Sequence, residues 1–203
     1  MVISHPLIAE HLTKVRDAET PSDEFRRRIG LIGQLMAFEV TKHIETRDVS
    51  VQTPLGSANG QELTRPIVLV PILRAGLGMM EGMLASIPQA KIGHIGMVRD
   101  EKTHRPTTYC CKLPPDMAEA DVILIDPMLA TGHSGADATT ILKEKGANRL
   151  TFVSLVSAPE GIKHFEETHP DVPMFTAAID SHLDENAYIF PGLGDAGDRC
   201  FGT

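Results

Sequence analysis

VILIDPMLATGHS, residues 122–134, is the stretch of sequence that decides the fold. Its first four residues are all apolar, which is typical of a strand buried on both faces of a parallel sheet. Asp126 ends this run, a short loop of small and polar residues follows, and residues 133–146 have the composition of a helix that Gly146 can terminate. The stretch therefore predicts a strand, a loop and a helix, with the loop at the carboxyl end of a sheet strand.

Similar apolar runs lie on both sides of this stretch. They are PIVLVPIL (66–73), KIGHIGMV (91–98) and LTFVSLVSA (150–158), and helix-like segments separate them. We therefore expect an α/β fold with an open, mainly parallel sheet flanked by helices. Upstream, apolar residues at helical spacing predict a long amphipathic helix from Ser22, a suitable N-cap, to about Thr46, and the segment ending at Thr64 predicts a hairpin.

Composition limits the classes of protein that need to be considered. The 203 residues and the 42% hydrophobic content suit one domain over residues 1–203. With 19 basic and 27 acidic residues the net charge is −8, which argues against nucleic acid or an anionic membrane as partner. No signal-peptide or membrane-spanning run is evident, and Cys110, Cys111 and Cys200 form no disulfide framework. We expect a cytoplasmic protein.

The loop that follows Asp126 has the composition of an anion site. Thr131, Gly132, His133 and Ser134 would present backbone N–H groups and two hydroxyls to a phosphate monoester at a helix N-terminus. A carboxylate cannot bind the phosphate itself, but Asp126 could accept hydrogen bonds from the hydroxyls of an attached sugar. At this point a plain strand-to-helix turn, with Asp126 as a helix cap, remains an alternative. A Walker-type site is excluded because the chain contains no GKS or GKT.

Three segments together resemble one enzyme family. DPMLATGHS (126–134) resembles the phosphoribosyl pyrophosphate (PRPP) signature of the type I phosphoribosyltransferases, in the form found in uracil phosphoribosyltransferases. PILRAGLGMMEGML (71–84) resembles the pyrophosphate-side loop of that family, and YIFPGLGDAGDRCFGT (188–203) resembles its uracil-binding segment. The segments occur in the expected order, and the resemblance extends from about residue 67 to residue 203.

The resemblance implies the fold and the activity. It implies a type I phosphoribosyltransferase-like sheet with N-terminal helices and a β-hairpin flap near residues 99–109. The implied reaction converts uracil and PRPP to UMP and diphosphate in pyrimidine salvage, with Mg²⁺ carried mainly by the substrate and no dedicated protein ligands for the metal. A homodimer or larger homo-oligomer and a GTP activator are further expectations of this kind.

The resemblance also implies which residues form the site. Catalysis is assigned to Asp126, Arg99 and Asp195. The residues implied for PRPP are Arg74, Arg99, Asp126, Pro127, Met128, Leu129, Ala130, Thr131, Gly132, His133, Ser134 and Asp195. Uracil is expected at Ile189, Gly194, Asp195 and Ala196, where main-chain groups would match its edge and leave buried partners unpaired if cytosine entered.

One residue departs from the family pattern. His133 stands where the family commonly has a second glycine, at a position that could require a backbone conformation glycine tolerates best. Our hypothesis is that the His133 N–H faces the phosphate and that its ring points away. A marked loss of substrate binding in His133→Gly would instead indicate a direct contact by the ring.

Two other functions are considered. A phosphoribosyltransferase for another base, such as a purine, is disfavoured by the C-terminal segment. A regulator that keeps the fold and binds RNA is disfavoured by the acidic balance and by the lack of an evident basic patch.

Overall fold

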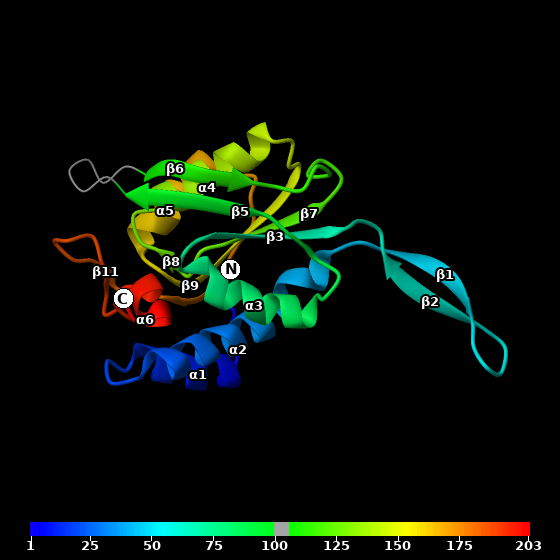
Figure 1. Ribbon diagram of the computed structural model, residues 1–203, viewed down its shortest axis with the longest axis horizontal. Coiled ribbons are helices and arrows are strands. Elements are labelled where there is room, and N and C mark those ends of the chain that lie inside the picture. Colours follow the sequence, from blue (N-terminus) through cyan, green and yellow to red (C-terminus); the bar gives the residue numbers. More distant parts are fainter. Residues whose placement is uncertain (100–105) are drawn as a thin grey trace.

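The fold is built on an open, mainly parallel sheet (Figure 1). The computed structural model describes residues 1–99 and 106–203, without the side chains of Arg99 and Pro106. The strands along the sheet are β10 (Met174–Ile179), β9 (Arg149–Ser157), β7 (Asp121–Ile125), β3 (Ile67–Leu73), β5 (His94–Arg99) and β6 (Pro106–Lys112). Two short strands, β4 (Lys91–Ile92) and β8 (Met128–Leu129), pair with β3 and β9. Only β5 and β6 pair in antiparallel fashion within this sheet of the described chain, so the predicted architecture is confirmed.

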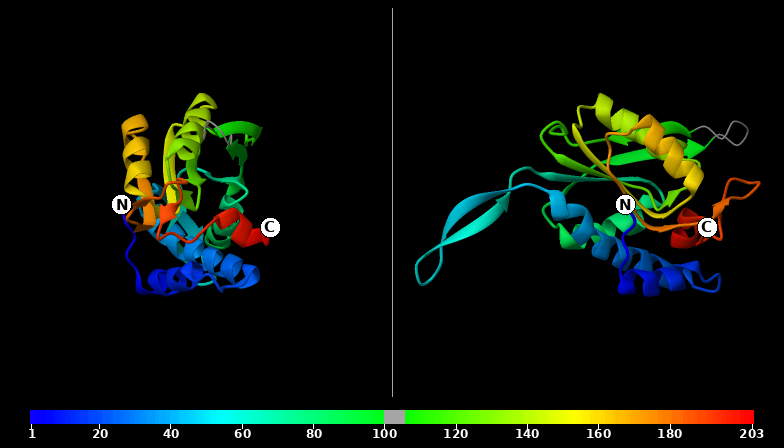
Figure 2. Two further views of the ribbon diagram at one scale, coloured as in Figure 1. Left: turned by 90° about the vertical axis from the view of Figure 1, so that its left-hand side faces the viewer. Right: turned by 180° about the vertical axis from the view of Figure 1, so that it is seen from behind.

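Helices cover both faces of the sheet (Figure 2). They are α1 (Pro6–Arg16), α2 (Ser22–Val40), α3 (Gly76–Ser86), α4 (His133–Glu144), α5 (Pro159–Thr168) and α6 (Ala196–Phe201). In β3, Ile67 and Leu69 pack toward α1, α2 and α3, whereas Val68 and Val70 pack toward α4 and α5. Because alternate residues of a strand face opposite sides of the sheet, both faces need apolar side chains, which explains the unbroken apolar runs.

The long amphipathic helix is shorter than the sequence pattern predicts. Helix α2 ends at Val40, and one turn of 3₁₀ helix, η1 (Thr41–His43), follows it. The prediction of Ser22 as N-cap is wrong, since Pro21 occupies that position and Ser22 is the first helical residue. The acidic Asp23 and Glu24 lie in the first turn instead, where they interact favourably with the helix dipole.

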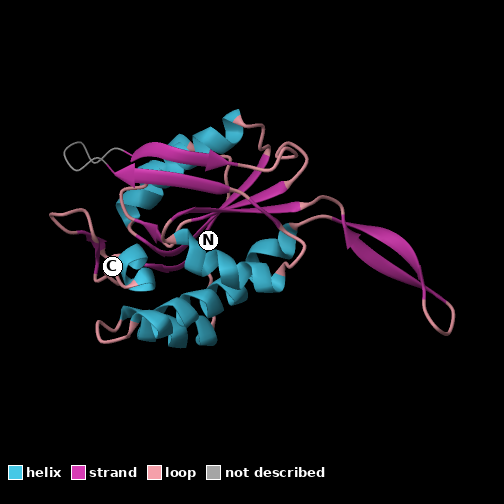
Figure 3. Ribbon diagram, viewed as in Figure 1, coloured by secondary structure: helices cyan, strands magenta, loops and turns pink. Residues whose placement is uncertain are grey.

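The predicted hairpin is confirmed as a separate two-stranded sheet. Strands β1 (Thr46–Gln52) and β2 (Ser57–Leu63) pair with each other and project from the body of the molecule (Figures 1 and 3). A second small sheet joins β11 (His182–Leu183) to β12 (Ile189–Phe190) near the C-terminal helix. Among the described helices, none is long and apolar enough to cross a membrane.

Candidate active site

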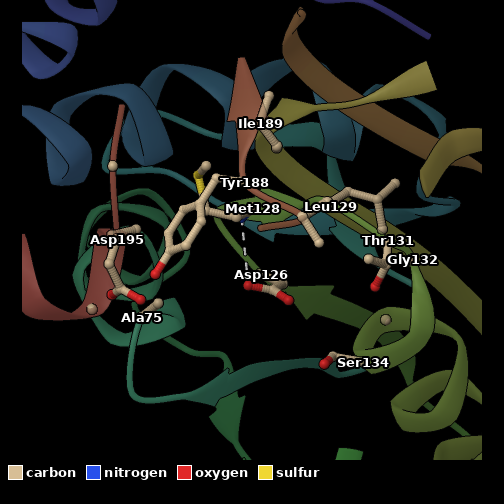
Figure 4. A pocket seen from close by; sticks show the side chains of 16 residues that line it. Ala75, Asp126, Met128, Leu129, Thr131, Gly132, Ser134, Tyr188, Ile189 and Asp195 are labelled. Atoms are coloured by element: carbon tan, nitrogen blue, oxygen red, sulfur yellow. Dashed lines mark hydrogen bonds between the residues drawn. The ribbon is translucent and has the colours of Figure 1, made fainter. Parts of the chain in front are cut away.

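A cavity of about 330 Å³ opens at the carboxyl ends of the central strands. Three parts of the chain line it: the start of the β3–α3 connection, the loop between β7 and α4, and the segment from β12 into α6 (Figure 4). Its walls are Ala75, Asp126, Met128, Leu129, Ala130, Thr131, Gly132, Ser134, Gly135, Ala187, Tyr188, Ile189, Gly194, Asp195, Ala196 and Gly197.

A second cavity of about 460 Å³ adjoins the first. The two share Ala75, Asp126, Asp195 and Gly197, and the second is completed by Ile72, Leu73, Arg74, Met97, Val98 and Tyr109. The two predicted carboxylates therefore lie where the cavities meet. The first cavity has a helix N-terminus in its wall, and the second has the guanidinium of Arg74.

The loop between β7 and α4 turns at Gly132, which has φ of +84° and is the N-cap of α4. A Cβ atom there would lie 2.7 Å from the carbonyl oxygen of Gly161 on α5, so only glycine suits both the turn and the packing. The first backbone N–H groups of α4 have no partner in the preceding turn of the helix. They and the hydroxyls of Thr131 and Ser134 lie at the predicted anion site.

Asp126 is a carboxyl group with an altered acidity. Burial raises its pKa to about 7, and the nearby Asp195 carboxylate adds to the rise, whereas a long hydrogen bond of 3.5 Å from the Met128 N–H opposes it. A carboxyl with a pKa of about 7 can gain or lose a proton near neutral pH. The position therefore suits a group that binds or releases protons as a polar ligand enters.

Arg74 lies in the second cavity and is held by the C-terminal part of the chain. Its Nη2 lies 2.9 Å from Oδ1 of Asp198, and its Nη1 donates to Oγ1 of Thr203 at 3.2 Å. The Leu73–Arg74 peptide bond is cis. Both members of the Arg74–Asp198 pair are about half exposed, so the pair is weak and an anion could displace Asp198 from the guanidinium.

The C-terminal segment reaches the site as a short, tightly anchored helix. The Asp195 carboxylate caps α6 and accepts a hydrogen bond of 2.9 Å from the Asp198 N–H. The Arg199 guanidinium donates to the carbonyl oxygens of Leu193, Val15 and Asp17 at 2.7, 2.6 and 2.5 Å. These bonds join the segment before α6 to the end of α1.

A partly buried ion pair anchors the same segment from the other side. Arg16 forms two bonds of 2.6 and 2.7 Å with the Asp180 carboxylate, and this carboxylate also accepts from the Gly192 N–H at 2.8 Å. Arg16 further donates to the Gly192 carbonyl oxygen at 2.7 Å. The wall of the first cavity that contains Gly194 and Ala196 is thus fixed to the N-terminal helices.

Most residues predicted for the site lie together in the two cavities. Those in the first cavity are Asp126, Met128, Leu129, Ala130, Thr131, Gly132, Ser134, Ile189, Gly194, Asp195 and Ala196. Arg74 lines the second, and Pro127 is not among the residues that line either one. Arg99 is the last residue of β5, but its side chain lies outside the described part of the chain.

His133 is placed beside the cavity without lining it. It is the first residue of α4, and its Nδ1 lies 3.0 Å from Nε2 of His164 on α5. The positive φ of the loop belongs to Gly132 and not to His133, so the expected backbone cost of a histidine here does not arise.

Sequence reasoning missed several residues that line the cavities. Ala75, Gly135 and Gly197 each lie within or next to a motif, so extending the motifs by a residue would have included them. Tyr188 is the first residue of the C-terminal motif, and Ala187, with φ of +62°, directly precedes it, but neither was predicted to line the site. The position of Tyr109 in the wall of the second cavity depends on how two strands pair, which the sequence does not reveal.

The fold is one that phosphoribosyltransferases share. Among solved structures, a hypoxanthine phosphoribosyltransferase from Staphylococcus aureus shares the fold, with a TM-score of 0.53 and 17% identity over 78% of this chain and 76% of that one. A protein from Aquifex aeolicus matches with a TM-score of 0.95 and 35% identity over 100% of this chain and 98% of that one.

The family follows from the sequence comparisons. The family model described as uracil phosphoribosyltransferase matches residues 2–203. Relatives named uracil phosphoribosyltransferase occur in Clostridium perfringens, 50% identical over 99% of this chain and 97% of theirs, and in Dictyoglomus turgidum, 52% identical over 100% and 99%. The chain belongs to the uracil phosphoribosyltransferase family. The resemblance is thereby confirmed, and the enzyme is favoured over an RNA-binding regulator.

Proposed function

We propose that this chain transfers the phosphoribosyl group of PRPP to uracil, forming UMP and diphosphate in pyrimidine salvage. The observation that carries the proposal is the order of groups along one continuous site. An anion loop at α4 lies at one end, the Asp126 and Asp195 carboxylates lie at the junction, and Arg74 lies at the other end. PRPP has the same order of parts, which are a 5-phosphate, ribose hydroxyls and a diphosphate.

The 5-phosphate would bind at the N-terminus of α4. Backbone N–H groups in the first turn and the hydroxyls of Thr131 and Ser134 are donors, and the helix dipole favours an anion. This placement leaves Asp126 near the ribose, where the carboxylate accepts hydrogen bonds from vicinal hydroxyls.

The diphosphate would bind in the second cavity. Arg74 exchanges its surface partner Asp198 for phosphate oxygens, which its planar guanidinium can contact in pairs. Arg99 is proposed to bind the diphosphate as well, on the basis of the family motif alone. Stabilising the departing diphosphate in a site that excludes water is the main contribution expected of the protein.

Uracil would bind in the first cavity against the C-terminal segment. Ile189, Gly194 and Ala196 supply main-chain donors and acceptors for the edge of the base, and Asp195 lies close enough to the junction to orient the base nitrogen. This nitrogen displaces diphosphate at the anomeric carbon, so the reaction requires no protein nucleophile. Alignment of base and sugar then supplies much of the rate.

Mg²⁺ is proposed to enter with PRPP. Within residues 1–99 and 106–203, no group of three or more His, Cys, Asp or Glu side chains is placed to hold a metal ion. The proposed ion would be bound mainly by substrate oxygens and water. When bound, the ion would neutralise charge on the leaving diphosphate.

Four broader properties complete the proposal. The chain would act in the cytoplasm as one domain over residues 1–203, assembled as a homodimer or larger homo-oligomer, with GTP as an activator. The support is membership of the family, and for the assembly also the projecting β1–β2 hairpin. Activation would be tested by adding GTP to the assay below.

The direct test is formation of UMP and diphosphate from uracil, PRPP and Mg²⁺, with cytosine, hypoxanthine and no base as parallel controls. We expect turnover with uracil alone and loss of turnover when the metal is chelated. Tight PRPP binding without turnover on any base would show that the proposed activity is wrong.

A further inference from the structure

Tyr109 occupies an irregular position in the antiparallel pair β5–β6. Gly96 lies opposite Cys110, whereas Met97 lies opposite Thr108, so Tyr109 is an extra residue of β6 with no partner in β5. Such a β-bulge bends the strand and redirects the side chain of the inserted residue. The bulge lies beside the second cavity, which Tyr109 lines.

The residue opposite the bulge makes room for the tyrosine ring. A Cβ atom on Gly96 would lie 2.5 Å from Cζ and 2.9 Å from the hydroxyl oxygen of Tyr109. The ring therefore packs directly on the backbone of β5, at a place that any larger residue would obstruct. Gly96 and the bulge together fix the direction of the phenol.

Tyr109 lines the part of the site that is proposed to bind the diphosphate. Arg74, Asp126 and Asp195 form other walls of the same cavity. The side chain stays 60% exposed, and no residue in the described part of the chain hydrogen-bonds to its hydroxyl. A hydroxyl that has no hydrogen-bond partner among the described residues can donate to a bound anion.

We infer that the Tyr109 hydroxyl donates a hydrogen bond to the diphosphate group of PRPP and to the free diphosphate product. The inference rests on the proposed function and adds a substrate-contacting residue to it. Arg74 supplies charge on this side of the site, and a neutral donor at Tyr109 adds directional recognition of phosphate oxygens.

The test compares Tyr109→Phe with the unchanged enzyme in two inhibition assays. Diphosphate and UMP are each titrated as product inhibitors with Mg²⁺ present. Diphosphate would occupy only the diphosphate side of the site, and UMP only the remainder of the site. We expect the substitution to weaken inhibition by diphosphate about tenfold, as for loss of a hydrogen bond to a charged group, and to leave inhibition by UMP within about twofold. Cys111→Ala, an exposed neighbour outside both cavities, serves as the matched control.

A second substitution tests the seat of the ring. Gly96→Ala should displace the phenol and produce the same selective loss of diphosphate inhibition, although the Tyr109 hydroxyl and the diphosphate oxygens are both still present. Unchanged diphosphate inhibition in Tyr109→Phe, or an equal loss for UMP and diphosphate, would overturn the inference. Absence of turnover in the unchanged enzyme would instead overturn the proposed function, so the two failures are distinguishable.

Discussion

Asp126 is a partly buried carboxyl at the position proposed to bind the ribose, and burial raises its pKa at a cost in stability. In the unfolded chain this group titrates near 3.8, and in the folded chain near 7. Between these values the folded chain binds more protons than the unfolded chain, so stability decreases as the pH rises from about 4 to about 7. Above pH 7 the full cost of the buried charge is present.

Removing that charge should stabilise the enzyme increasingly as the pH rises above about 4. We predict that Asp126→Asn raises the free energy of unfolding at pH 8 by about 1–2 kcal/mol, or Tm by about 2–8 °C, because the open cavity screens part of the charge. At pH 3.5, below the pKa of Asp126 in both the unfolded and the folded chain, the two proteins should unfold alike. Thermal unfolding without ligand measures the stability at both pH values. In steady-state assays of the same variant, kcat/KM for PRPP should fall about 10- to 100-fold.

Asp121→Asn is a suitable control because it changes a carboxylate at the opposite end of the same strand, outside both cavities. It should give no gain in Tm at pH 8. A gain for Asp126→Asn that is equal at pH 3.5 and pH 8 would show that the change acts through packing and not through charge.

Individual residues differ in how far the sequence could identify them. Asp126, Thr131 and Gly132 follow a buried strand directly, so their place at the edge of the sheet follows from local pattern. Tyr109 lines the site because of a bulge and of Gly96 on the opposite strand, and both depend on strand register. Register is a property of two paired segments, which a pattern read along one segment does not contain.

At the scale of elements, helix α6 could not be predicted from the sequence pattern. Its six residues are too few for helical periodicity, and a Gly-, Pro- and Asp-rich segment favours a loop. The structure forms a helix there because Asp195 caps it and Arg199 ties it to α1. The bonds from Arg199 to Val15 and Asp17 connect residues more than 180 positions apart. Strands β3 and β7, in contrast, were predictable because each carries its own apolar run.

The anchoring of α6 predicts the effect of a conservative change at Arg199. Lysine has one ammonium group in place of the planar guanidinium of arginine, and it cannot reach three carbonyl oxygens together. We predict that Arg199→Lys lowers the free energy of unfolding by about 1–3 kcal/mol and raises KM for uracil several-fold more than KM for PRPP. Chemical denaturation and steady-state kinetics measure the two effects.

Arg27→Lys provides the comparison for that change. The Arg27 guanidinium pairs with Glu24 at the surface of α2, where an ion pair contributes at most about 1 kcal/mol, so both KM values should be unchanged. If Arg199→Lys changed both KM values equally, the link from α1 to the uracil side of the site would be wrong.

At the scale of the whole molecule, the sheet and its two helical layers account for the body, but they leave the β1–β2 hairpin outside it (Figure 1). Leu55 at its tip is fully exposed, and Val51 is 45% exposed. A two-stranded hairpin is at best marginally stable alone in water, and exposed apolar residues at a projecting tip suit contact with another chain. The proposed homo-oligomer would provide that contact.

Charged substitutions in the hairpin should therefore impair assembly and leave the fold of the body intact. We expect Val51→Lys with Leu55→Lys to shift the protein toward single chains in light scattering, because two charges would be buried at the contact, while circular dichroism of the body stays the same. Ser50→Lys with Gln52→Lys adds equal charge at exposed polar positions of β1 and should assemble normally. If the unchanged protein is itself a single chain at micromolar concentration, the proposed assembly is wrong, and the hairpin then requires a different partner to cover its tip.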